Sequence, residues 1–72
     1  MRTLSLAELQ ALEPIKQRVL DTMQAIDDAT VGRYFDANPD IEEHAMDCID
    51  SNCIERIERV LGQLQRILKA VQ

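Results

Sequence analysis

The range from Asn38 to Val71 constrains the fold most, because its pattern is that of a long amphipathic helix. Asn38 can cap a helix N-terminus, and Pro39 suits the first helical residue. Apolar residues then recur every three or four positions, the spacing of one helix face, at Ile41, Ala45, Ile49, Cys53, Ile57, Val60, Leu64, Ile67 and Val71. The pattern predicts one helix over the whole range.

Ser51 and Asn52 are the weakest point of this prediction. Asn52 followed three residues later by Glu55 would form a capping box and start a new helix. The apolar spacing continues through both residues, however, so we favour a continuous helix over a broken one. Gly62 lowers helix stability by about 1 kcal/mol relative to Ala, which indicates either close packing there or simple tolerance.

A second helical pattern occupies residues 5–31. Ser5 and Glu8 have the spacing of a capping box, and apolar residues follow at helical spacing. Pro14 lacks an amide hydrogen, and its ring collides with the carbonyl four residues earlier. The range therefore predicts either one helix kinked at Pro14 or a short helix broken there. Gly32 can supply a left-handed closing turn, which places the helix end between residues 31 and 35.

The two ranges together predict an all-α protein: an antiparallel helical hairpin that forms one domain over residues 1–72. The scarcity of aromatic, glycine and proline residues favours helices over strands. A chain this short has a small core, and its apolar stripe is wider than a two-helix seam. We therefore expect two hairpins to form a four-helix-bundle homodimer, with self-association through Ile57, Leu61, Leu64 and Leu68.

Charge is distributed unevenly along the chain. Residues 21–50 carry a net charge of −8, whereas residues 1–20 and 51–72 carry +1 and +2. In a hairpin the acidic middle forms the tip, and the two basic segments meet at the other end. Repulsion between like charges then favours an antiparallel dimer, in which each acidic tip lies beside the basic end of the other hairpin.

The same tip is the predicted partner-binding site. It contains the two aromatic residues of the chain, and interaction hot spots are enriched in aromatic residues and arginine. We expect a basic protein surface to bind there, through Arg33, Tyr34, Phe35, Asp36, Asp40 and Glu43. The simpler interpretations are that the carboxylates form a solvated surface and that the two rings cap the core.

His44, Cys48 and Cys53 are the soft metal ligands of the sequence. His44 and Cys48 lie one helical turn apart and share a face, but zinc takes three or four protein ligands. In a continuous helix Cys53 would point away from both. We therefore predict no metal and no cofactor, and a metal- or redox-responsive regulator that uses these three residues is the alternative function.

Other function classes are disfavoured. The sequence has no glycine-rich phosphate loop and no convincing pair of nucleophile and base, so we predict that the protein is not an enzyme. A net charge of −5 disfavours binding to nucleic acid. No apolar run is long enough to span a membrane, and the first residues lack a signal-peptide pattern.

Two cysteines make no disulfide framework, so we expect a cytoplasmic location. The sequence thus predicts a small cytoplasmic protein-interaction module of the adaptor, chaperone or anti-activator type, which acts through its apolar helix stripe and its acidic tip. Besides the metal- or redox-responsive regulator, a structural subunit of a larger complex is the remaining alternative.

Overall fold

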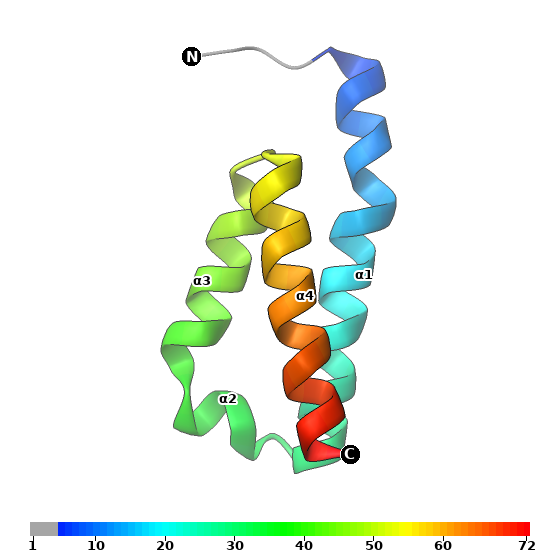
Figure 1. Cartoon of the computed structure of the whole chain (residues 1–72). Helices are drawn as coiled ribbons and strands as arrows, with labels where there is room; N and C mark the ends of the chain where they lie inside the picture. Colours follow the sequence, from blue (N-terminus) through cyan, green and yellow to red (C-terminus); the bar gives the residue numbers. More distant parts are fainter. Residues whose placement is uncertain (1–4) are drawn as a thin grey trace.

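A computed structural model describes residues 5–72, so the first four residues of the predicted domain lie outside the description. The helices in chain order are α1 (Leu6–Thr30), α2 (Arg33–Ala37), α3 (Pro39–Asp50) and α4 (Ile54–Val71). Helices α1 and α4 run in the same direction, and α3 runs opposite to both (Figure 1). The short α2 joins the end of α1 to the start of α3. The all-α prediction is confirmed for the described residues.

Helix α1 begins with the predicted capping box. The Oγ atom of Ser5 accepts a hydrogen bond from the backbone N–H of Glu8 at 3.2 Å, and the Glu8 carboxylate accepts one from the Ser5 N–H at 3.5 Å. The helix continues through Pro14, so the predicted alternative of a break at this residue is wrong. Pro14 and Gln10 are both exposed, where water can bind the carbonyl that a proline leaves unpaired.

Two consecutive left-handed residues end α1 within the predicted range. Val31 has a φ of 55° and Gly32 a φ of 76°, and the N–H of Gly32 donates to the Asp27 carbonyl at 2.8 Å. Glycine adopts this conformation without strain, whereas a β-branched residue does not. The chain then enters α2, where the Tyr34 N–H donates to the Thr30 Oγ at 3.2 Å.

The predicted continuous helix over residues 38–71 is wrong, and with it the two-armed hairpin. The chain leaves α3 at a turn, residues 51–53, and α4 returns antiparallel to α3 (Figure 1). Asn52 has a left-handed backbone with a φ of 53°, which asparagine tolerates better than most residues. Its Oδ1 atom accepts a hydrogen bond from the Nζ of Lys16 on α1. This long-range bond ties the turn to the first half of α1.

Ser51 stabilises the same turn from within. Its Oγ donates to the Cys48 carbonyl at 2.6 Å and accepts from the Cys53 N–H at 3.3 Å. These bonds satisfy backbone groups that lose their partners where a helix stops. The predicted second capping box does not form, because Cys53 is the N-cap of α4 and makes no side-chain cap bond. Polar side chains at the turn therefore outweigh the uninterrupted apolar spacing.

The core lies where α1 and α4 pack along each other. Its largest fully buried side chains are aliphatic: Val19, Ile26, Ile57, Val60 and Leu64. The residues predicted for self-association belong to this core, because Ile57, Leu61 and Leu64 are buried and Leu68 packs against them. The wide apolar stripe of α4 is thus occupied by α1 and α3 of the same chain.

Helix α1 is longer than its neighbours. Its first turns extend beyond the α3–α4 turn (Figure 1), and Leu6 there is 72% exposed. The molecule is accordingly elongated, with principal extents of 38 × 19 × 15 Å. Over residues 5–72, no helix combines the length and the apolar character required to cross a bilayer.

Candidate functional site

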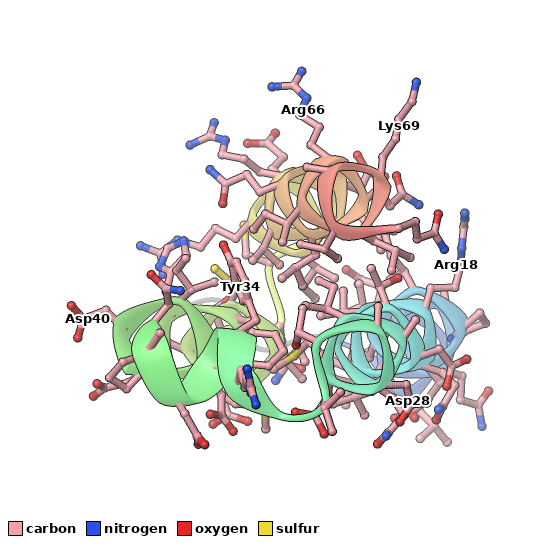
Figure 2. All side chains as sticks on the ribbon, turned by 90° about the horizontal axis from the view of Figure 1, so that it is seen from below. Arg18, Asp28, Tyr34, Asp40, Arg66 and Lys69 are labelled. Atoms are coloured by element: carbon pink, nitrogen blue, oxygen red, sulfur yellow. The ribbon has the colours of Figure 1, made fainter. Side chains whose placement is uncertain are left out.

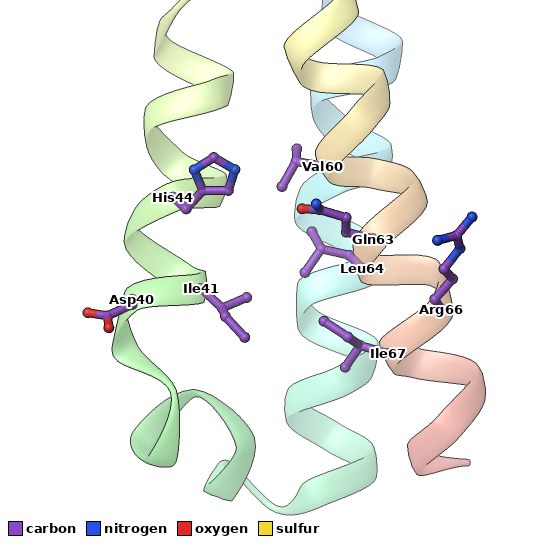
Figure 3. A pocket seen from close by; sticks show the side chains of 8 residues that line it. All are labelled: Asp40, Ile41, His44, Val60, Gln63, Leu64, Arg66 and Ile67. Carbon is purple, nitrogen blue, oxygen red and sulfur yellow. The ribbon is translucent and has the colours of Figure 1, made fainter.

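A groove of about 480 Å³ lies between α3 and α4 (Figure 3). It exists because the packing of α3 against α4 is looser than the packing of α1 against α4. Helix α3 contributes Asp40, Ile41 and His44 to its lining, and α4 contributes Val60, Gln63, Leu64, Arg66 and Ile67. The groove therefore lies between two helices that were predicted to be one continuous helix.

The floor of the groove is apolar. Val60 and Leu64 are fully buried beneath it, and Ile41 and Ile67 flank it with part of their surface still open to water. In Figure 3 the side chains of Ile41 and Ile67 point toward each other from the two helices. Partly covered apolar surface of this kind favours the binding of another apolar side chain.

Helix α3 is acidic, and Asp40 is the carboxylate that it contributes to the groove lining. Helix α3 carries no lysine or arginine, and its exposed carboxylates are Asp40, Glu42, Glu43, Asp47 and Asp50. His44 is also exposed, and its ring reaches toward α4 (Figure 3). The predicted acidic tip is therefore extended along the side of a helix rather than concentrated at a hairpin end.

The α4 side of the groove is basic. Gln63 and Arg66 line it, and Arg56 and Arg59 precede them at helical spacing on the same side of α4. All four side chains are exposed. Within the described part of the chain, neither the arginines nor Asp40 and Asp47 across the groove form an ion pair. The charges of both walls are thus available to a ligand.

The six residues of the predicted partner-binding tip differ in exposure and in position relative to the groove. Phe35 is only 8% exposed and belongs to the core, where its ring meets that of Tyr34 edge-on at a centroid distance of 5.4 Å. The interpretation of Phe35 as a cap on the core is therefore favoured. Tyr34 extends from α2 toward α4 (Figure 2), and Asp40 lines the groove. The other three residues are exposed outside the groove lining: Arg33, Asp36 and Glu43.

His44 lines the groove, whereas the two cysteines lie outside its lining. The Nε2 of His44 is 3.7 Å from the Sγ of Cys48, which is buried behind it, while Cys53 lies in the turn. Because the helix breaks between the two cysteines, their relative positions do not follow from the geometry of a continuous helix. Among residues 5–72, no group of three or more His, Cys, Asp and Glu side chains is placed to hold a metal ion.

Sequence reasoning missed the α4 wall of this site. The signal was present, since Arg59, Gln63 and Arg66 recur at helical spacing beside the apolar stripe. Their meaning depends on the break at Asn52, because only a broken helix places α3 alongside them. Comparisons of the chain with protein-family models, with curated proteins and with solved structures gave no significant match.

Proposed function

We propose that this chain is a small, cytoplasmic, non-enzymatic protein-interaction module of the adaptor, chaperone or anti-activator type. It binds a helical polypeptide segment in the groove between α3 and α4. The observation that carries this proposal is the combination of an apolar floor with two walls of opposite and unpaired charge. The acidic wall of α3 takes the place of the predicted acidic tip.

The shape of the groove favours a helix as its ligand. Its walls are two antiparallel helices (Figure 1), and side chains of a third helix can pack into the space between their ridges. An amphipathic helix offers apolar residues at the three- and four-residue spacing that such grooves accept. Those residues would cover Ile41 and Ile67, which gains about 25 cal/mol per Å² of apolar surface removed from water.

The charges on the two sides of the groove affect the orientation of a bound ligand and the rate at which it associates. We expect the basic side of a bound ligand to lie along α3 and its acidic side to lie along the arginines of α4. Charge complementarity of this kind raises association rates and selects the register more than it adds affinity. Because salt screens exposed charges, with a Debye length of about 10 Å at 0.1 M, binding should weaken as ionic strength rises.

A photo-crosslinking amino acid tests the proposal. It is introduced at Gln63, which lines the groove, and in a control variant at Gln65, an exposed glutamine two residues further along α4 that does not line it. We expect irradiation of cells that make the protein to give polypeptide adducts from position 63 and few or none from position 65. Equal adducts from both positions, or none from either, would contradict a polypeptide-binding groove.

A further inference from the structure

We infer that the ligand of the α3–α4 groove is the α3–α4 pair of a second copy of this chain, in a dimer whose twofold axis is parallel to the helices. This inference rests on the proposed function, since it names the occupant of the same groove. It commits to one arrangement of the two copies, which follows from the positions of four charged residues.

The two walls carry opposite charges at matching heights. Asp40 on α3 and Arg66 on α4 lie at nearly the same height along the groove (Figure 3). Asp47 follows Asp40 by seven residues, and Arg59 precedes Arg66 by seven residues. Seven residues make about two helical turns, and the two helices run in opposite directions. Asp47 and Arg59 therefore also share a height, about 10 Å further along.

At each of these two heights, or levels, the acidic and the basic side chain have no ion-pair partner within the described part of one chain. All four side chains are exposed, and in the described residues none of them forms an ion pair. In Figure 3 the carboxylate of Asp40 points away from α4, and Arg66 points away from α3. Each level thus has one acidic and one basic group, which lie on opposite outer sides of the groove.

A twofold axis parallel to the helices pairs all of these charges. Rotation about that axis turns a second groove to face the first, preserves every height and exchanges left with right. Helix α3 then faces α4 of the second copy. Asp40 meets Arg66 of the second copy, Asp47 meets Arg59 of the second copy, and symmetry repeats both pairs. Four ion pairs form around an apolar centre made by Ile41, Ile67 and their copies.

A twofold axis across the helices gives the opposite result. It places α3 against α3 and reverses the heights, so Asp40 would face Asp47 of the second copy and Arg59 would face Arg66. Like charges at this distance repel. The antiparallel dimer expected from sequence was reasoned from an acidic hairpin tip. Because the carboxylates lie along the side of α3, the same electrostatic reasoning now favours parallel copies.

Charge reversal tests the inference in solution. We expect Asp47→Arg and Arg59→Glu each to raise the dimer dissociation constant by roughly tenfold or more, because two exposed ion pairs become two like-charge contacts. An equimolar mixture of the two variants should form a heterodimer close to wild-type affinity, since every contact in it is again complementary. Analytical ultracentrifugation measures all three samples, at low and high salt.

The matched control is Asp28→Arg. It makes the same change of charge at an exposed position on α1, away from the groove (Figure 2), and should leave the dissociation constant unchanged. Circular dichroism checks that each variant keeps its helix content. If either variant loses it, Asp40→Arg mixed with Arg66→Glu repeats the experiment at the other level.

The outcomes separate this inference from the proposed function. A tighter Asp47→Arg dimer would overturn it in favour of an antiparallel arrangement, in which the new arginine meets Asp40. A wild-type chain that stays monomeric at millimolar concentration would also overturn it. In that second case, adducts of a different protein from position 63 would leave the proposed function standing. Absence of any adduct from position 63 would remove both.

Discussion

The two sides of α4 face helices of very different kinds. On one side α1 follows α4 along most of its length, and their shared seam leaves Val19, Ile26 and Ile57 without exposed surface. On the other side α3 makes a shorter and looser contact, and a groove of about 480 Å³ remains. The same helix therefore helps to close one interface and to leave another open.

The sequences of the partner helices explain the difference. Helix α1 has 25 residues and α3 has 12, so α3 covers only part of α4. The buried residues of α3 include the small side chains of Ala45 and Cys48, which fill less space than the aliphatic residues of α1. A wide apolar stripe on one helix can therefore stabilise the fold on the side that packs against α1 and remain open for binding on the side that faces α3.

The largest expected effect compares one isoleucine from each side of the molecule. Ile26 on α1 is fully buried, and Ile41 on α3 is only partly covered at the groove. We expect Ile26→Ala to lower the free energy of unfolding by about 2–5 kcal/mol, because it removes buried surface and leaves a cavity. Ile41→Ala should lower it by about 1 kcal/mol, because its surface is already partly hydrated. Urea titrations followed by circular dichroism measure both.

The interpretation of the two sides depends on the difference between these values. Equal losses would show that the groove is as well packed as the seam, and the comparison would fail. The crosslinking yield from position 63 should show the opposite order. Among folded molecules, Ile41→Ala should lower this yield more than Ile26→Ala does.

The second effect concerns the turn that creates the groove. Asn52 is left-handed and accepts a hydrogen bond from Lys16. We expect Asn52→Ala to destabilise the protein by about 1–2 kcal/mol, since alanine is strained in this conformation and cannot accept the bond. Asn52→Gly loses the bond but not the tolerance of positive φ, and should cost less. Thermal unfolding of both variants checks the order.

Lys16→Met serves as the control for the hydrogen bond, because it keeps most of the aliphatic side chain and removes the donor. It should cost about 1 kcal/mol or less. If Asn52→Ala and Lys16→Met were equally destabilising, backbone conformation at residue 52 would contribute little, and the break between α3 and α4 would need another cause.

Much of the fold could be predicted from local patterns. The capping box at Ser5 and Glu8, the end of α1 near Gly32 and the start of a helix at Pro39 are all short-range features, and all are present. Helical spacing also identified the apolar residues of the core. These features depend on neighbouring residues, so one sequence contains the information needed to find them.

The break at Asn52 could not be decided in the same way. Apolar spacing through residues 51–53 fits one helix or two, and one of the bonds that stabilise the turn comes from Lys16, thirty-six residues away. The candidate site has the same difficulty, because Asp40 and Arg66 line one groove only if the chain reverses between them. The fold class thus follows from local patterns, whereas the arrangement of the helices also depends on contacts between distant residues.

The third prediction tests the face of α4 that lies in neither interface. An added Cβ at Gly62 would meet no atom within 4 Å, so the tolerance interpretation is correct and that of close packing is wrong. We expect Gly62→Ala to stabilise the protein by about 0.5–1 kcal/mol, because alanine loses less backbone entropy in a helix. A loss of stability in urea titrations, with an unchanged dimer dissociation constant, would contradict an open face.

The smallest expected effect lies at the end of the α1 seam. Val31 has a φ of 55° and is 84% exposed, so it carries backbone strain without contributing buried surface. Val31→Gly should raise the free energy of unfolding by about 0.5 kcal/mol, because relief of the strain slightly exceeds the greater freedom of glycine in the unfolded chain. Val31→Asn, which tolerates the left-handed region with less such freedom, should match or exceed it. Destabilisation by both variants in thermal unfolding would mean that Val31 stabilises the seam. The closed side of α4 would then extend one turn further than burial indicates.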